Sequence, residues 1–167
     1  MERLWSPWRL PYVTREAGTE TEDDGCIFCE LKGRNEDLVL YHGSLCFVIL
    51  NLYPYNNGHV MVVPNRHLAE LARTTADERA ELMSLVRLGE MALVEAYRPG
   101  GINVGINLGR PAGAGVLEHL HIHLVPRWSG DTNFMGVIAE TRVLPEDLSQ
   151  TAARLRPIFE RLADAPA

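Results

Sequence analysis

Positive charge, cysteine and long apolar runs are all scarce in this sequence of 167 residues. No apolar run approaches the length of about 20 residues that crosses a membrane, and residues 1–10 lack the apolar stretch of a secretory signal. The 16 Lys and Arg are outnumbered by 22 Asp and Glu, with a formal net charge of −6 and no basic cluster. Because long nucleic acids need a basic face, we expect no nucleic acid polymer and no membrane as partners, although a small nucleotide stays possible. A cytoplasmic location is the default expectation.

The three cysteines are Cys26, Cys29 and Cys46. An odd number in a reducing compartment argues against a disulfide framework. Cys46 stands in the apolar run 45–50 and fits a buried strand residue. Cys26 and Cys29 have the two-residue gap of a zinc knuckle, but a lone pair of this spacing is often just two reduced thiols. A tetrahedral structural site would need two more ligands.

The length and the apolar fraction of 46% fit one globular domain over residues 1–167. We divide it into an N-terminal extension with an acidic loop (1–25), a core (26–140) and a C-terminal helical segment (141–167). Within the first part, Trp5, Trp8 and Tyr12 suggest a segment pinned to the body by aromatic side chains. Near the end of the core, residues 134–139 form a short apolar stretch.

Hydrophobic periodicity predicts the elements of the core. Strand patterns lie at 38–41, 45–50, 59–63 and 102–107, the first two as a hairpin. Thr75 and Glu78 form a capping box that begins a long helix, which Pro99-Gly100-Gly101 ends. Residues 146–163 look helical, with Pro157 bending or restarting the helix. Strands mostly follow strands, so the expected fold class is α+β with an antiparallel sheet.

Three histidines alternate with aliphatic residues in the run His119-Leu120-His121-Ile122-His123. In a strand, successive side chains point to opposite faces, so Leu120 and Ile122 would face the core and the imidazoles the other face. Imidazole can act as nucleophile, proton carrier or metal ligand. Three such groups in a row are hard to explain as packing.

Two kinds of chemistry fit this strand. In the first, a neutral imidazole such as His121 attacks phosphorus, and His123, with backbone N–H groups of the loop 109–115, stabilises the phosphoryl oxygens. Asn107 would fix the tautomer of His121 or hold a phosphate oxygen. In the second, His-x-His presents ligands to a catalytic zinc, which needs three protein ligands and one open position. The residues alone leave both open.

The run from His119 to Val125 resembles the signature of the histidine triad (HIT) superfamily, in which three histidines alternate with apolar residues. The match extends over roughly 1–12 and 38–148, and it is closest to the diadenosine tetraphosphate phosphorylase (ATP adenylyltransferase) branch. The matching segments are Leu4-Trp5-Ser6-Pro7-Trp8-Arg9, 51–64 (NLYPYNNGHVMVVP), 103–109 (NVGINLG), Glu118-His119 and Pro126-Arg127-Trp128. The resemblance implies a five-stranded antiparallel sheet with one long helix and a C-terminal helix. It also implies a homodimer that joins two sheets into one.

The resemblance also implies roles for individual residues. His121 would be the nucleophile that forms a nucleotidyl-histidine, His123 would bind the α-phosphate, and Asn51 would hold the ribose hydroxyls. The other implied or candidate site residues are His119 within the triad, His59 just behind it, Asn107 and the loop glycines Gly113 and Gly115 near the phosphates, and Trp128 as a base-stacking ring. Trp128 or Trp8 could equally close the core or the dimer contact. Gly115 stands where hydrolase and phosphoramidase branches usually have Gln, which leaves phosphate binding to backbone N–H groups, Asn107 and Arg110.

Some members of the superfamily, and related uridylyltransferases, bind zinc through a cysteine pair and two histidines. The matching residues here are Cys26, Cys29, His67 and His119, which would form a closed structural Zn²⁺ site. We expect no organic cofactor. The leading hypothesis is a phosphorylase that converts a diadenosine polyphosphate to nucleotides, such as diadenosine tetraphosphate and phosphate to ATP and ADP. The alternatives are a dinucleoside polyphosphate hydrolase, an adenosine phosphoramidate hydrolase or a nucleotide-binding regulatory protein.

Overall fold

The computed structural model describes residues 25–31, 37–131 and 146–164. The aromatic segment predicted around Trp5, Trp8 and Tyr12 and the apolar stretch 134–139 lie outside the described residues. The division of the chain at residues 25 and 140 therefore stays a prediction. No helix among the described residues is long and apolar enough to span a bilayer.

The described elements confirm the predicted order of strands and helices. They are α2 (Ile27–Leu31), β1 (Val39–His42), β2 (Cys46–Leu50), β3 (Val60–Pro64), η2 (Leu71–Arg73), α3 (Ala76–Tyr97), β4 (Gly101–Ile106), η3 (Arg110–Ala112), β5 (Ile122–Arg127) and α5 (Leu148–Ala163). The strands form one five-stranded sheet in the order β1-β2-β3-β5-β4, with every neighbouring pair antiparallel. The predicted α+β class with an antiparallel sheet is therefore confirmed.

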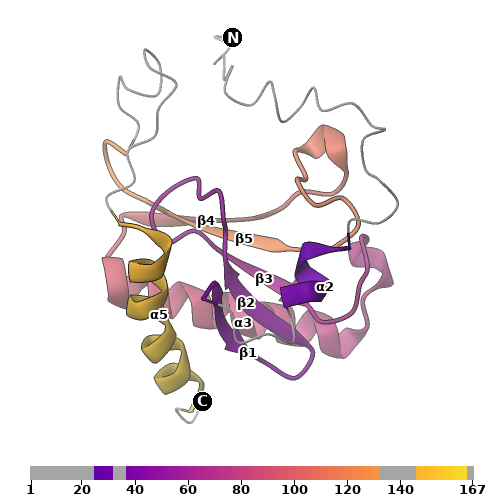
Figure 1. The fold of residues 1–167 in the computed structure, drawn as a ribbon, viewed down its shortest axis with the longest axis horizontal. Coiled ribbons are helices and arrows are strands. Elements are labelled where there is room, and N and C mark those ends of the chain that lie inside the picture. Colours follow the sequence, from indigo (N-terminus) through magenta and orange to yellow (C-terminus); the bar gives the residue numbers. More distant parts are fainter. Residues whose placement is uncertain (1–24, 32–36, 132–145, 165–167) are drawn as a thin grey trace.

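The two faces of the sheet carry different cores. On β2, Cys46, Val48 and Leu50 join the larger core beneath α3 and α5, whereas Phe47 and Ile49 point to the opposite face. This alternation is the period of two that a strand imposes on its side chains. Figure 1 shows α3 behind the sheet and α5 beside it. On the opposite face, the short helix α2 covers a smaller core.

The long helix α3 begins where the sequence predicts. The Thr75 side chain accepts a hydrogen bond from the Glu78 amide, and the Glu78 carboxylate accepts one from the Thr75 amide, so the capping box is complete. Near the middle of the helix, a Cβ on Gly89 would lie 3.0 Å from Cδ2 of Leu124, so glycine allows α3 to pack closely on β5. The helix ends at Arg98, whose φ of 45° is left-handed.

Two sequence expectations need correction. The strand predicted from His119 begins only at Ile122, because the amide of Leu120 donates to the carbonyl oxygen of Leu68 instead of joining the sheet. Pro157 does not restart the last helix, since α5 runs unbroken through it. Pro157 and Ala153 four residues earlier are both exposed, so the carbonyl group left without its amide donor can face water.

Candidate active site and metal centre

The alternation predicted for the histidine run holds in three dimensions. Leu120, Ile122 and Leu124 belong to the core beneath α3, so His121 and His123 point to the opposite face. On that face the two imidazole rings meet edge to face, with centroids 4.8 Å apart. Both side chains are buried, with relative exposures of 4% for His121 and 8% for His123.

The tautomer of His121 follows from its hydrogen bond. Its Nδ1 lies 2.8 Å from the carbonyl oxygen of His119, and a carbonyl can only accept, so Nδ1 carries the proton. The lone pair of a neutral imidazole then resides on Nε2. No described residue forms a hydrogen bond with that Nε2. This arrangement suits a nucleophile, and the role of His121 as one stays a prediction.

The tautomer of His123 is set by a chain of two hydrogen bonds. The backbone amide of Tyr55 donates to Nδ1 of His59 over 3.0 Å, so the proton of a neutral His59 sits on Nε2. That Nε2–H donates to Nδ1 of His123 over 3.0 Å. The proton of His123 is consequently on Nε2. His123 thus offers an N–H donor beside His121, which a phosphate-binding group needs, and its contact with phosphate stays a prediction.

Burial keeps both imidazoles neutral. Desolvation lowers the pKa of His121, although the bond to the His119 carbonyl acts in the opposite direction. Desolvation, with a smaller effect of His121, lowers the pKa of His123 to about 4. Both shifts favour the neutral imidazole, the form that keeps a lone pair on one ring nitrogen.

Asn51 lies close to the catalytic pair. Its Oδ1 accepts from the Tyr53 amide over 2.9 Å, which directs Nδ2 to within 3.5 Å of His59 Nε2. The carboxamide therefore stands beside the histidines, where the resemblance places the ribose.

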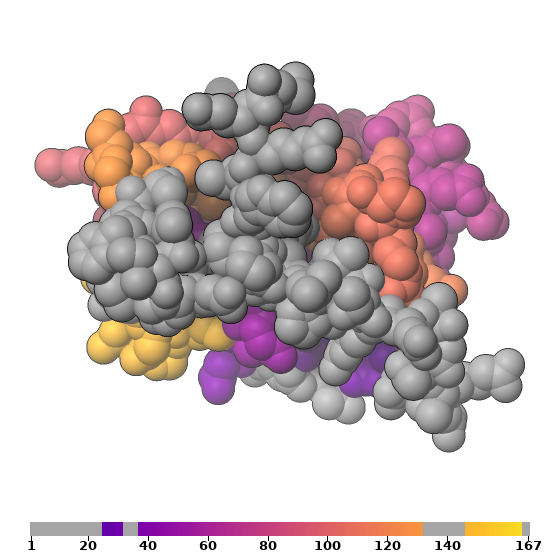
Figure 2. Space-filling view, turned by 90° about the horizontal axis from the view of Figure 1, so that it is seen from above, coloured from indigo at the N-terminus to yellow at the C-terminus, as the bar shows by residue number. Residues whose placement is uncertain are grey.

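The glycine loop between β4 and β5 has a firm internal structure. It stands above the sheet at the right of Figure 1 and lies at the surface in Figure 2. Gly109 and Gly113 have φ of 83° and 92°, a region that favours glycine. The amides of Ala112, Gly113 and Ala114 donate to carbonyl groups within the loop, and Asn107 Nδ2 donates to the Gly113 carbonyl over 3.3 Å. Phosphate contacts of Asn107, Gly113 and Gly115 stay predictions.

The described ring contact of Trp128 is with the helix layer. Its ring meets Tyr97 of α3 edge to face, with centroids 6.5 Å apart. The Tyr97 hydroxyl donates to Glu146 over 2.5 Å. The backbone of Trp128 forms hydrogen bonds with Asp131, so the Tyr97 contact concerns the ring alone, and stacking of that ring on a base stays a prediction.

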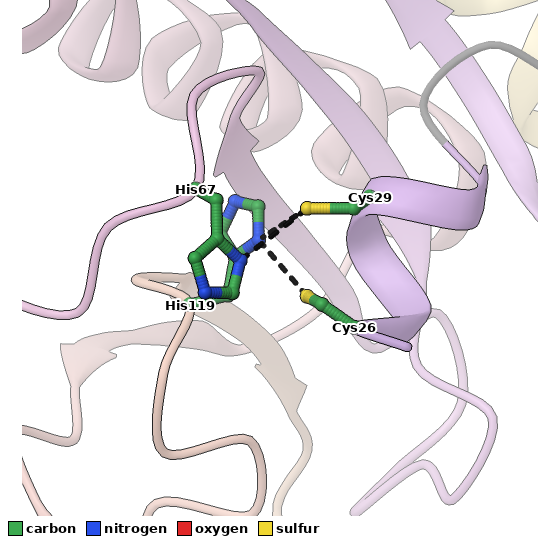
Figure 3. A group of neighbouring side chains, drawn as sticks. All are labelled: Cys26, Cys29, His67 and His119. Atoms are coloured by element: carbon green, nitrogen blue, oxygen red, sulfur yellow. Dashed lines mark hydrogen bonds between the residues drawn. The ribbon is translucent and has the colours of Figure 1, made fainter. Parts of the chain in front are cut away.

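Four side chains far apart in the sequence form a compact cluster of possible metal ligands. The ligand atoms of Cys26, Cys29, His67 and His119 all lie within 4.8 Å of one another (Figure 3). Sγ of Cys26 is 3.2 Å from Nδ1 of His119, and Sγ of Cys29 is 3.3 Å from Nδ1 of His67. In a tetrahedral zinc site, sulfur and nitrogen ligands are about 3.5 Å apart. The donor set thus fits a closed Cys₂His₂ site, as the sequence predicts.

His119 differs from the other two histidines of the run. Its Nε2 lies 2.8 Å from the carbonyl oxygen of Pro64 and so carries the proton, which leaves the lone pair on the Nδ1 that faces the thiols. A backbone carbonyl that orients a ligating imidazole in this way is common around zinc. The ring of His119 therefore faces the two cysteines, while its backbone carbonyl accepts the hydrogen bond from Nδ1 of His121.

Two aromatic residues that were not predicted as part of the site lie against His121 and His123. Phe28 of α2 is buried, and its ring centroid lies 5.3 Å from that of His121 and 5.4 Å from that of His119. The ring of Tyr55 lies 5.9 Å from that of His123. Two sequence positions could have indicated these contacts: Phe28 lies between Cys26 and Cys29, and Tyr55 lies four residues before His59.

Comparisons with known proteins agree with this geometry. A family model described as "HIT domain" matches residues 32–130. The AP-4-A phosphorylase of Mycobacterium tuberculosis is 42% identical over 96% of this chain and 86% of its own length. A Zn-bound histidine triad family protein from Mycobacterium smegmatis has a TM-score of 0.69 at 27% identity, over 85% of this chain and 98% of that one. Together these findings confirm the HIT fold, and the chain belongs to the HIT family of nucleotidyltransferases and hydrolases.

Proposed function

We propose that the protein is a nucleotidyltransferase that cleaves diadenosine tetraphosphate with inorganic phosphate to give ATP and ADP. The observation that carries the proposal is the tautomer of His121, whose Nδ1–H is held by the His119 carbonyl so that Nε2 bears the lone pair. The similarity to a relative named AP-4-A phosphorylase, which extends over 96% of the chain, supports the choice of substrate.

The reaction proceeds in two displacements at the same phosphorus. Nε2 of His121 attacks an α-phosphorus, the N–P bond forms, and the bond to the bridging oxygen breaks to release ATP. The imidazole of the adenylyl-histidine is then cationic, with Nδ1–H still donating to the His119 carbonyl. An oxygen of inorganic phosphate attacks next, the N–P bond breaks, and ADP leaves with His121 restored.

The neighbouring residues stabilise the charge that develops at phosphorus. His123 directs its Nε2–H at a non-bridging oxygen, and His59 supports it from behind. Asn51 holds the ribose hydroxyls. On the side of the glycine loop, we assign phosphate contacts to Asn107 and the amide of Gly115, since the amide of the predicted Gly113 already donates to the Arg110 carbonyl.

A direct assay separates the possible reactions. Purified protein is incubated with diadenosine tetraphosphate, with and without phosphate, and the nucleotides are resolved by chromatography. ATP plus ADP, formed only with phosphate, supports the proposal, whereas AMP plus ATP without phosphate identifies a hydrolase. No turnover in either condition rejects both. A His121→Ala variant must lose the adenylated intermediate seen by mass spectrometry, and His42→Ala, an exposed histidine on β1, is the matched control.

We also propose that Cys26, Cys29, His67 and His119 hold one structural Zn²⁺. Four protein ligands leave no open position, so the metal would tie α2 to the segment that precedes β5 rather than act on the substrate. The test is elemental analysis together with thiol titration. Two results together would support the site. Elemental analysis should give about one zinc per chain, and after mild unfolding without metal release only the thiol of Cys46 should be titratable. A metal-free protein in which Cys26 and Cys29 react freely would reject it.

A homodimer is the assembly that we propose for the protein. Apolar side chains are exposed on α3 and at or just beyond β4, which is an edge strand of the described sheet. They are Met83, Met91, Val94, Val104 and Leu108. Exposed apolar side chains on a helix and along an edge strand each favour pairing with a second copy. Sedimentation should give a dimer mass, and Val104→Lys should weaken the dimer. A cytoplasmic location stays a prediction.

A further inference from the structure

Tyr55 occupies an unusual position beside the catalytic histidines. Its ring centroid lies 4.7 Å from that of His59 and 5.9 Å from that of His123. The same residue donates its backbone amide to Nδ1 of His59. With 41% of its surface exposed, Tyr55 stands between solvent and the two hydrogen-bonded imidazoles.

The loop that carries Tyr55 is fixed on both sides. Asn56 Nδ2 donates to the carbonyl oxygen of Pro126 over 3.1 Å and to Asp131 over 2.9 Å, which ties the loop to the end of β5. Asn57, the next residue, donates to Glu146 over 3.3 Å. An aromatic ring on so well-anchored a loop has a defined position, and large apolar groups left exposed on a fixed loop often serve function.

We propose that Tyr55 is a positioning residue, whose amide and ring together hold the His59–His123 pair with Nε2–H of His123 aimed at the phosphoryl group. The amide selects the tautomer of His59, and the hydrogen bond passes that choice to His123. The ring excludes water that would compete for the His59–His123 bond. A hydrogen bond screened from water is stronger and better aligned, so the donor is prepared before the substrate arrives.

The proposal rests on the proposed function only for its effect on catalysis. The tautomer of His123 is a property of the free protein and can be read by ¹⁵N NMR without substrate. In the wild-type protein, Nε2 of His123 should show the shift of a protonated nitrogen and Nδ1 that of an unprotonated one. The opposite pattern would overturn the proposal, whatever the enzyme does with diadenosine tetraphosphate.

Three variants then test the ring. Tyr55→Phe keeps the ring and should retain kcat and the His123 tautomer. Tyr55→Ala removes the ring but keeps the backbone amide, so it should expose the His59–His123 bond to water and weaken the preference for the Nε2–H tautomer of His123. We expect kcat to fall roughly 10-fold, less than the loss of about 10²–10⁴-fold that complete removal of a positioned proton donor causes. KM should stay within about twofold. Tyr53→Ala, which removes an 80% exposed ring from the same loop, is the matched control and should behave as wild type.

The remaining outcomes each contradict the proposal. An unchanged kcat and tautomer in Tyr55→Ala would show that the ring does not hold the pair. An equal loss in Tyr55→Phe would assign the effect to the hydroxyl, and a rise in KM alone would make Tyr55 a substrate contact instead. If the wild-type enzyme turns over no dinucleoside polyphosphate, the proposed function fails, while the NMR result still decides the role of Tyr55.

Discussion

The ion pair between Glu78 and Arg66 connects the start of α3 to the loop that carries His67. The Glu78 carboxylate accepts from Nε and Nη2 of Arg66 over 2.9 and 2.8 Å and from the amide of Thr75 over 2.7 Å. The hydrogen bonds from Arg66, more than any other contact, lower the pKa of Glu78 from its ordinary 4.5 to about 2. We predict that Glu78→Gln, which can preserve the capping box but removes the charge, destabilises the fold at neutral pH.

The size of the effect follows from the pKa. The difference of 4.5 − 2 = 2.5, at about 1.36 kcal/mol for each pKa unit, gives an upper limit of roughly 3 kcal/mol. The Arg66 side chain is 49% exposed, so solvent screens the pair, and we expect about 1–2 kcal/mol. For a chain of this size, that lowers Tm by about 3–6 °C.

The pH dependence of this stabilisation provides the stricter test. Because folding lowers the pKa of Glu78, the stabilising effect is complete above pH 4.5 and is lost as the pH falls toward 2. Urea unfolding of the wild type and Glu78→Gln at a series of pH values measures it, and contributions common to both proteins, including metal loss, cancel in the difference. Glu90→Gln, an exposed site on the same helix, is the control. A stability difference as large at pH 2.5 as at pH 7 would refute the reasoning.

Three further substitutions test the packing around the site by thermal or urea unfolding. Arg98→Gly should stabilise the protein by roughly 0.5–1 kcal/mol, because glycine adopts the left-handed conformation at the end of α3 without strain; no gain would count against it. Gly89→Ala should cost about 1–3 kcal/mol, because its Cβ would lie 3.0 Å from Leu124, and a neutral result would show that α3 can shift. Tyr97→Phe should cost about 1–2 kcal/mol, since Glu146 loses a donor at 2.5 Å. An effect below about 0.5 kcal/mol, the size of an ordinary surface change, would mean that water replaces the hydroxyl.

Local patterns in the sequence were sufficient for most of the fold. The Thr75 capping box and the hairpin of β1 and β2 are determined by residues close together in the chain, and both are confirmed. The start of β5 was predicted too early because it depends on a distant contact, the bond from the Leu120 amide to the Leu68 carbonyl. Alternation alone cannot show where a strand leaves the sheet.

The same difference between local patterns and distant contacts holds for the candidate site. The spacing of the histidines predicted which face His121 and His123 share, since strand geometry determines it. The rings that surround them come from elsewhere: Phe28 approaches His121 from 93 positions earlier in the chain, and no local pattern indicates that contact. Tyr55 is close to His59 in sequence, but its position over His123 depends on how the loop folds back.

His119 shows why three equivalent residues in a sequence acquire different chemistry. Both ring nitrogens are engaged among the described residues, Nε2 with the Pro64 carbonyl and Nδ1 with the thiol of Cys26. What His119 provides to the catalytic pair is its backbone carbonyl, which fixes the tautomer of His121. One residue thus contacts the cysteine thiols through its ring and His121 through its backbone. Under the proposed mechanism, the histidine run is a reacting pair, His121 and His123, and an anchor, His119.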